Sequence, residues 1–350
     1  MFKVTFFGRV FKALLFFILI MLLSSSCDKE NPVKENEPEK NFSQLIRFDI
    51  SSRFLEGKGI SCIESGADSS IWITSGKELY LLKGGEKETY TLDFPILDIS
   101  MAKDETLWIG TNGGGLGHLT GNGITWFTKA NAGLPRDYIG NVEAGPDGRI
   151  WFSSCASDYG GLVIYNGKKF VLYTPENSPL NQHVISEIEI DKGGSVYFVT
   201  SGKVSRTNVY RISDFSWDCL GNENGTFYWV SVFSVAPSGV IYLIEDFSLS
   251  SSSIDSNALF EYRGKTWQKV EADFISLFSL FSSIKADKRN YCWLAGFGEN
   301  SPVLHVYNGE SWVSSPEGIF PDDYVTVIEA DSENNIWIGT SQNGVFVLNQ

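Results

Sequence analysis

The chain of 350 residues contains three histidines, His118, His183 and His305. His118 and His305 lie in apolar runs, where a packed structural histidine is the expected arrangement. His183 closes the polar segment 177–183 and is placed where a ligand could reach it. Alone it makes neither a metal site, which needs three or four ligands, nor a catalytic pair. The sequence therefore predicts no catalytic residue, no metal and no cofactor.

Carboxylates, amides and tyrosines gather in the short segments that join the apolar runs. A pyranose offers one apolar face to stack on an aromatic ring and several hydroxyls to hydrogen-bond, so this mixture fits a sugar site. The predicted ligand-binding residues are Asn112, Arg136, Asp137, Tyr138, Asp158, Tyr159, His183, Asp322, Asp323, Tyr324 and Asn343. Tyr138 and Tyr324 hold equivalent positions in the chain, and packing is the competing explanation for both.

The elements that must position these residues form a repeat, in which phrases like Asp331-Ser-Glu-Asn-Asn-Ile-Trp337-Ile-Gly-Thr340 recur. Its aromatic anchors are Trp72, Trp108, Trp151, Tyr197, Tyr242, Trp293 and Trp337. A period of about 40 to 50 residues with short strands and Gly, Asp or Asn turns is typical of a β-propeller. We predict an all-β, seven-bladed propeller of four-stranded antiparallel blades, with the anchors in the core. The turn aspartates Asp104 and Asp147 are interpreted as hairpin formers.

The third unit shows how four strands fit one repeat. Its expected strands cover residues 139–144, 149–153, 162–165 and 170–173, with a Gly-rich loop ending at Gly160-Gly161. The turn Asn166-Gly167 predicts a type I′ hairpin, which needs positive φ at both central residues. The same turn recurs at Asn308-Gly309, with Arg263-Gly264 as a looser copy.

The two ends of the repeat region predict how the ring closes. The seventh unit stops at residues 345–349 and lacks its outermost strand, while residues 45–50 form an alternating strand with no unit of its own. Pairing the two would remove the exposed sheet edges.

The expected domains are a lipoprotein signal peptide at 1–26, a lipidated flexible tether at 27–44 and the propeller at 45–350. The long Ser-rich insertion at 245–257 is interpreted as a lid or as a solvated loop.

The N-terminal segment predicts export. Three basic residues precede the apolar run 13–23, which is too short to span a bilayer but suits a signal peptide. Leu22-Leu-Ser-Ser-Ser-Cys27 resembles the lipobox of bacterial lipoproteins, with Ser24 where that motif usually has leucine. The resemblance implies lipidation of Cys27; ordinary secretion with a free Cys27 is the alternative. We expect an anchor in the cell envelope of a Gram-negative bacterium, with the outer membrane or cell surface favoured over the inner membrane.

The net charge of the chain limits the class of partner that it can bind, and its cysteines are a separate feature. The net charge of −14 becomes −17 without the leader, and such a surface disfavours nucleic acid and anionic lipid headgroups, which need clustered Lys and Arg. The lipid anchor alone would hold the protein at a membrane. The remaining cysteines fall on separate predicted blades and are expected to be buried free thiols. They are Cys62, Cys155, Cys219 and Cys292.

The repeat wording resembles the two-component regulator propeller repeats. The residues that carry the resemblance are Trp108-Ile-Gly-Thr111 with Gly115-Leu116, Asp147-Gly148 with Trp151 and Gly160-Gly-Leu162, and Trp337-Ile-Gly-Thr340 with Gly344. In that family the propellers most often form the periplasmic sensors of hybrid histidine kinases and respond to glycan fragments. This chain ends at Gln350 on a propeller strand, so the resemblance implies a recognition surface and leaves a regulatory role in doubt.

Two functions follow as hypotheses. The first is an exported lipoprotein whose propeller is a non-catalytic module for glycan fragments or an envelope protein partner. The alternative is a propeller lyase or hydrolase acting on an extracellular substrate, since the blade number resembles that of the streptogramin-opening lyases. The alternative requires His183 to meet two or more carboxylates or other histidines at the central mouth.

Overall fold

The computed structural model describes residues 41–156, 159–201, 207–221, 227–246, 257–298, 303–320 and 323–350. The chain divides into two units, Met1–Asn41 and Phe42–Gln350, and the second is the folded unit described below. Predictions for the leader, for Cys27, for most of the insertion, and for Asp158 and Asp322 concern residues outside the described ranges. Within those ranges, no helix is long and apolar enough to cross a membrane.

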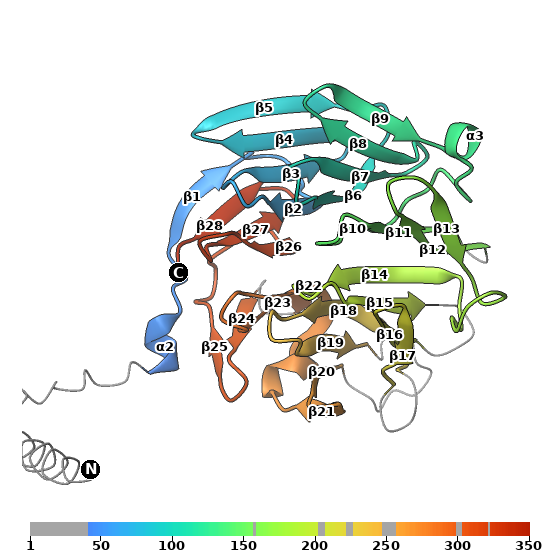
Figure 1. Cartoon of the computed structure of the whole chain (residues 1–350). Helices are drawn as coiled ribbons and strands as arrows, with labels where there is room; N and C mark the ends of the chain where they lie inside the picture. The colour runs from blue at the N-terminus through green and yellow to red at the C-terminus, as the bar shows by residue number, and fades with distance from the viewer. Residues whose placement is uncertain are drawn as a thin grey trace, which may run out of the picture. The chain divides into compact units, whose positions relative to one another are not determined.

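Seven four-stranded antiparallel sheets surround a central channel, as predicted (Figure 1). Blade 1 comprises β2 (Cys62–Ser65), β3 (Ile71–Ser75), β4 (Glu78–Lys83) and β5 (Glu86–Thr91); blade 2 comprises β6 (Ile96–Met101), β7 (Leu107–Thr111), β8 (Leu116–Thr120) and β9 (Gly123–Phe127). Blade 3 comprises β10 (Val142–Ala144), β11 (Ile150–Ala156), β12 (Tyr159–Tyr165) and β13 (Phe170–Tyr173); blade 4 comprises β14 (Val184–Ile190), β15 (Val196–Ser201), β16 (Asn208–Ser213) and β17 (Ser216–Cys219).

The remaining blades repeat this order, with the first strand innermost and the fourth at the rim. Blade 5 comprises β18 (Val230–Val235), β19 (Ile241–Glu245), β20 (Ala258–Arg263) and β21 (Thr266–Val270); blade 6 comprises β22 (Phe278–Ala286), β23 (Cys292–Gly298), β24 (Val303–Tyr307) and β25 (Trp312–Ser314). Blade 7 comprises β26 (Val325–Ala330), β27 (Ile336–Thr340), β28 (Val345–Leu348) and β1 (Ile50–Phe54). Short helices α2 (Phe42–Leu45) and α3 (Lys129–Ala132) and the 3₁₀ turn η1 (Asp273–Leu277) lie between strands.

The predicted ring closure is confirmed, but the closing strand lies further along the chain. Strand β1 pairs antiparallel with β28 and overlaps the strand expected at 45–50 only at Ile50; Leu45 ends the helix α2, and residues 46–49 have no regular structure. Ile46 is buried in the core between blades 6 and 7, with Phe42 and Phe48 packed against it. These apolar residues hold the segment against the ring side by side with the end of the chain, where the Gln350 amide donates to the Arg47 carbonyl at 2.7 Å.

The structure confirms the positions of the predicted hairpins, but the turns at Asn166 and Asn308 are not type I′. Asn166 and Asn308 do not have positive φ, and each begins a four-residue loop in which its side-chain oxygen accepts two backbone N–H groups. Positive φ at two consecutive residues occurs instead in the two-residue loop Gly264-Lys265. In blade 3, β10 is shorter than expected: the Ile139 N–H donates to Thr111 of β7 in blade 2, and Gly140 and Asn141 bond to Ser153 of β11 outside the regular ladder. Strand β12, by contrast, extends back through Gly160 and Gly161.

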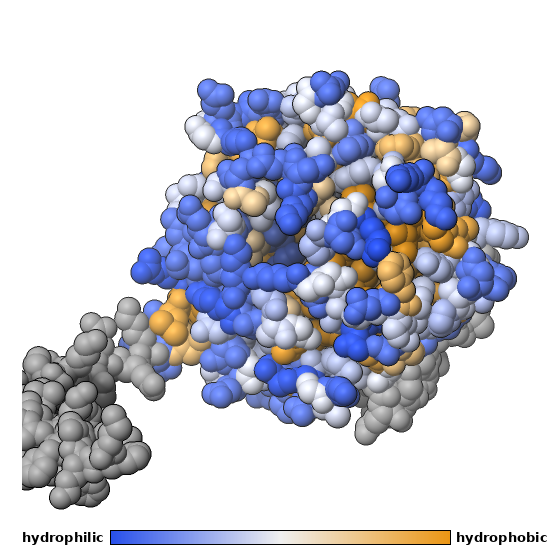
Figure 2. Space-filling model, in the orientation of Figure 1, coloured by the Kyte–Doolittle hydropathy of each residue, from blue (hydrophilic) through white to orange (hydrophobic). Residues whose placement is uncertain are grey.

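The hydrophobic core is divided among the blade interfaces. Each of seven buried clusters joins two adjacent blades, for example Trp151 and Leu162 of blade 3 with Ile185 and Phe198 of blade 4. All seven anchor aromatics are buried, as predicted. Because a sheet face is apolar only where another sheet covers it, the ring leaves its axis and its two faces to polar groups. Hydrophilic side chains accordingly cover most of the face seen in Figure 2.

Turn aspartates explain why the repeat phrase begins with Asp. Asp331 accepts a hydrogen bond from the Trp337 indole at 2.9 Å, and Asp287 accepts one from the Trp293 indole at 3.1 Å. Asp104 and Asp147 accept backbone N–H groups two residues ahead, so their predicted role as hairpin formers is confirmed. The repeated phrase therefore marks a turn whose aspartate, in blades 6 and 7, accepts a hydrogen bond from the buried anchor tryptophan of the same hairpin.

Gly115 is required by both conformation and space. Its φ is +84°, and a Cβ built on it would lie 2.2 Å from the Phe127 carbonyl oxygen. Gly148 has nearly the same φ, +80°, but a Cβ there would meet nothing within 4 Å. The two positions thus separate the cost of left-handed backbone from the cost of steric overlap.

We expect Gly148→Ala to lower the free energy of unfolding by about 1 kcal/mol, the usual cost of a left-handed non-glycine residue. Gly115→Ala should cost at least about 2 kcal/mol more, because the Phe127 backbone must also move. Urea unfolding of both variants measures the difference. Equal losses would show that the loop yields without strain.

Candidate functional site

Exposed large hydrophobic side chains gather on one face of the ring. We call mouth face the side that carries the loops between second and third strands and the loops that link successive blades. Its exposed members are Phe94, Tyr138, Tyr159, Tyr228, Leu280, Phe297 and Tyr324. The opposite side, the turn face, carries one exposed member, Phe215, among the described residues. Such a concentration of apolar groups on one face marks a surface available for binding.

A groove on the mouth face brings several predicted residues together. It has a volume of about 560 Å³ and is lined by Lys129, Pro135, Arg136, Tyr159, Gly160, Leu172, Thr174, Glu176 and His183. The Tyr159 ring is 69% exposed, and the Arg136 guanidinium lies over it, 5.7 Å from the ring centroid. His183 donates from Nδ1 to the Gly160 carbonyl at 3.1 Å, and its Nε2 lies 3.3 Å from Glu176. Three predicted residues, Arg136, Tyr159 and His183, therefore share one cavity.

Other predicted residues are engaged within the fold. Asp323 is buried and accepts hydrogen bonds from Ser341 and from the backbone N–H groups of Gln342 and Asn343, which fixes the second loop of blade 7. Burial opposes ionisation of Asp323, but the Ser341, Thr340 and backbone hydrogen bonds outweigh it and lower its pKa. Asp137 similarly accepts the Lys129 N–H at 2.6 Å.

The remaining predicted residues lie on the mouth face outside the groove. Asn112 pairs with Tyr138 through an isolated β-bridge, and the side chain of Asn343 is exposed. Tyr138 and Tyr324 are both exposed, so core packing does not account for them. Tyr324 instead makes an edge contact with Phe297, at 6.2 Å between centroids.

The other two histidines are structural, as predicted. His118 stacks on Trp108 with ring centroids 4.0 Å apart, and His305 is buried against Phe274 at 3.6 Å. Burial lowers the pKa of both, to about 4 for His305. Both lie on third strands, away from the channel. Among the described residues His183 meets one carboxylate, Glu176, so the arrangement that the lyase hypothesis requires is not found there.

The central channel has a second organised set of polar groups that the sequence analysis did not identify. In every blade the residue opposite the anchor aromatic lies on the innermost strand and faces the axis. This channel ring consists of Glu64, Ser100, Glu143, Glu189, Ser234, Lys285 and Glu329. Its five charged members, together with Asp98 and Glu187 one step nearer the mouth, line a cavity of about 270 Å³, whereas Ser100 and Ser234 are buried.

The channel ring connects neighbouring blades. Glu64 accepts the Met101 N–H at 2.8 Å, and Glu189 accepts the Val235 N–H at 2.6 Å, each from the next blade. Ser100 and Ser234 accept in the same way from Ala144 and Ala286. The innermost strands have no sheet partner on their axial edge, so these acceptors satisfy N–H groups that would otherwise lack a partner.

Burial changes the pKa values of the carboxylates that line the channel. Burial is the main cause that raises the pKa of Asp98 to about 7 and of Glu64 and Glu187 to about 8, and neighbouring carboxylates raise the last two further. Lys285, which forms an ion pair with Glu329 at 2.8 Å, is the one lysine or arginine that lines the channel cavity. Within the described ranges, no three His, Cys, Asp or Glu side chains converge closely enough to hold a metal ion.

The cysteine prediction needs one correction. Cys62 and Cys292 are buried free thiols, and burial raises the pKa of both. Cys219 is free but exposed, because it ends β17, the outermost strand of blade 4, which no other sheet covers. The side chain of Cys155 lies outside the described part of the chain.

Comparison with known proteins supports the class defined by this geometry, a seven-bladed propeller. Residues 319–342 match the family model for the two component regulator propeller, so the chain carries a repeat of that family. This match confirms the resemblance predicted from the repeated phrase. No curated protein matches the sequence.

Several solved structures share the fold. The extracellular domain of the putative one component system BT4673 from B. thetaiotaomicron is 17% identical, with a TM-score of 0.60 over 86% of this chain and 39% of its own. Inactive virginiamycin B lyase from Staphylococcus aureus, with quinupristin, is 14% identical, with a TM-score of 0.67 over 85% and 98%. PorZ, a surface component of the type-IX secretion system of Porphyromonas gingivalis, is 13% identical, with a TM-score of 0.62 over 86% and 48%. The chain therefore spans less than half the length of the sensor and of PorZ.

Glu187 allows a test of the channel, because its raised pKa has no offsetting hydrogen bond among the described residues. An acid whose pKa is raised by folding binds its proton more tightly in the folded state. The free energy of unfolding should therefore fall as pH rises from about 4 to about 8. Glu187→Gln should flatten this fall and stabilise the protein at pH 8 by about 1 kcal/mol or more.

Urea unfolding across this pH range measures the effect, with Glu86→Gln on the exposed strand β5 as the matched control. If the free energy of unfolding of both variants falls with pH as steeply as that of the wild type, the ionised form of Glu187 is not destabilised by its surroundings.

Proposed function

We propose that the propeller is a non-catalytic binding module for glycan fragments and that the mouth face is its binding surface. The observation that carries the proposal is the groove beside Tyr159, where an exposed aromatic ring lies next to charged and hydroxyl side chains. Stacking on the ring and hydrogen bonds to Thr174, Glu176 or Arg136 are the two contacts that a pyranose needs. The fold shared with an extracellular sensor domain supports this use of the surface.

A protein partner in the cell envelope is the second candidate. The cluster Leu280, Phe297 and Tyr324 on blades 6 and 7 lies apart from the groove and is exposed and apolar, which suits a protein contact better than a sugar. The fold shared with PorZ, a bacterial surface component, is consistent with that role.

The proposed location is the cell envelope, with Cys27 as the lipid anchor and residues 28–40 as the tether. Support comes from the signal-like run 13–23 and the lipobox resemblance of residues 22–27. The shared fold with an extracellular domain and a surface component agrees with export. The outer membrane or cell surface remains the favoured site within the envelope.

Tyr159→Ala tests the glycan site. A panel of polysaccharide fragments is first screened by thermal melting of residues 42–350, and the strongest ligand is titrated by calorimetry. We expect the variant to bind about tenfold more weakly, because loss of a stacked ring removes about 1.4 kcal/mol. Recovery of unchanged sugar after incubation would support the non-catalytic assignment.

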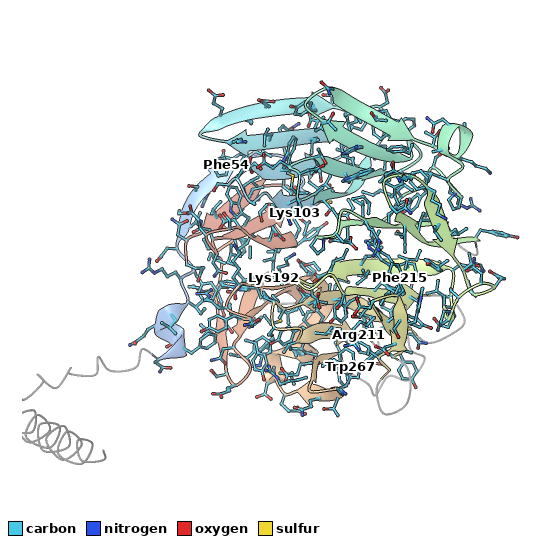
Figure 3. The ribbon with its side chains drawn as sticks, viewed as in Figure 1. Phe54, Lys103, Lys192, Arg211, Phe215 and Trp267 are labelled. Atoms are coloured by element: carbon cyan, nitrogen blue, oxygen red, sulfur yellow. The ribbon has the colours of Figure 1, made fainter. Side chains whose placement is uncertain are left out.

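The matched control is Phe215→Ala. Phe215 is 63% exposed and has Arg149 over its ring at 4.4 Å, so it reproduces the Tyr159–Arg136 pair on the turn face (Figure 3). We expect wild-type affinity for this variant. Equal affinity of all three proteins would place the site away from the groove, and absence of binding to every sugar would favour the protein partner.

Cys27→Ala tests the anchor. In cells supplied with an alkyne-bearing fatty acid, the wild-type protein should take up label and sediment with membranes, and Cys27→Ala should do neither. Cys219→Ala is the control, since Cys219 is the exposed cysteine of the propeller among the described residues. Labelling that persists without Cys27 would rule out this residue as the acceptor.

A further inference from the structure

The groove beside Tyr159 carries positive charge in a strongly acidic protein. The chain has 42 acidic and 28 basic residues, yet Lys129 and Arg136 both line this cavity. Neither forms an ion pair with any residue that the structure describes. By contrast, Arg149, Arg211, Arg263 and Arg289 each contact a carboxylate close to them in sequence. Within the described part of the chain, the two cations in the groove therefore lack the carboxylate partner that these four arginines have.

Arg136 is held in an orientation that leaves its donors available. Its guanidinium carbon lies over the Tyr159 ring, 5.7 Å from the centroid, and the guanidinium has no carboxylate partner among the described residues. An edge of two parallel N–H donors is the geometry that binds a carboxylate or a sulfate through two hydrogen bonds. The same tyrosine presents the rest of its exposed ring for a sugar to stack on.

His183 adds a third basic group at the far wall of the groove. Its Nδ1 lies 3.1 Å from the Gly160 carbonyl, and its Nε2 lies 3.3 Å from the Glu176 carboxylate. Of the described residues that line the cavity, Glu176 is the one carboxylate, and it is already engaged with His183. The open part of the groove, between Arg136 and Lys129, is thus left with positive charge.

We propose that this groove binds the anionic group of an acidic sugar, with Arg136 and Lys129 as counter-charges and Tyr159 as the stacking platform. The inference rests on the proposed glycan-binding function and names its substrate class. A uronate carboxylate and a sulfate ester share the required chemistry. The volume of about 560 Å³ is sufficient for one or two sugar rings beside the anionic group.

The test uses sugars that differ only in charge. Residues 42–350 are titrated by calorimetry with oligogalacturonate and its methyl-esterified form, and with sulfated and unsulfated dextran fragments. We expect each acidic form that binds to do so at least about tenfold more tightly than its neutral counterpart, as hydrogen bonds between charged groups imply. Raising NaCl from about 0.05 to about 0.5 M should weaken that binding several-fold.

Arg136→Gln should abolish the preference for the acidic form and leave binding of the neutral form nearly unchanged. Arg149→Gln on the turn face is the matched control and should behave as wild type, since Arg149 has its own partner in Asp147 at 2.7 Å. Preference for the carboxylated pair identifies a uronate, and preference for the sulfated pair identifies a sulfate ester. Both outcomes support the proposal.

Two results would overturn it. If acidic and neutral forms bind equally and Arg136→Gln changes neither, the groove does not recognise charge, although the glycan-binding function stands. If no sugar in either pair binds while thermal unfolding shows that the protein is folded, both the anionic site and the glycan function are wrong.

Discussion

Every blade of this protein has an innermost strand whose axial edge has no sheet partner, and the structure depends on how those edges are satisfied. Hydrogen bonds from the next blade end on the side chains of the channel ring, as in Met101 N–H to Glu64 and Ala144 N–H to Ser100. Side chains of the channel ring thus join blade 1 to blade 2, blade 2 to blade 3, blade 4 to blade 5 and blade 5 to blade 6. The outer closure is separate, since β1 completes blade 7 by pairing with β28. Hydrogen bonds to side chains therefore connect blades at the centre of the ring, and backbone hydrogen bonds between β1 and β28 close it at blade 7.

The use of carboxylates as acceptors in the channel has an electrostatic consequence. Carboxylates are good acceptors for backbone N–H groups, but six of them line the channel cavity opposite the single ammonium of Lys285. The raised pKa values of Glu64, Asp98 and Glu187 follow mainly from burial, with repulsion between carboxylates as a further cause for Glu64 and Glu187. Lys103 and Lys192, in the turns after the first strands of blades 2 and 4, appear near the ring centre in Figure 3.

The two faces differ because of the connections that each carries. Turns on one side are short and tied to the buried anchors by aspartates such as Asp331 and Asp287, which leaves little freedom to build a site. Loops on the mouth face are longer and bear the exposed aromatics. The Arg149–Phe215 and Arg136–Tyr159 pairs show the difference, since Arg149 is neutralised by its own turn aspartate whereas Arg136 lines an open groove. The proposed binding site therefore lies on the face whose loops the fold constrains less.

The sequence placed residues correctly on the mouth face where local sequence puts them on a loop. Tyr159 and His183 were expected at the mouth and lie in one groove, although they come from different blades. Asp323 was expected on the same surface, but a buried carboxylate that accepts several N–H groups fixes a loop instead. The channel ring was missed despite a simple signal, because its members stand eight positions before each anchor, as Glu64 does before Trp72. Their identities vary among Glu, Ser and Lys, so the repeated position was not apparent from residue type.

By itself the sequence determined the number of blades, the burial of the anchors and the face on which the loops gather. These follow from periodicity, since an apolar strand pattern that returns at a nearly constant interval can bury itself only against its own repeats. Tertiary structure alone decided which side chains meet across blades: Arg136 with Tyr159 in the groove, and Lys285 with Glu329 in the channel. Such pairs depend on the rotation from one blade to the next and on the side-chain conformations that fill the space between them. No local pattern encodes either quantity.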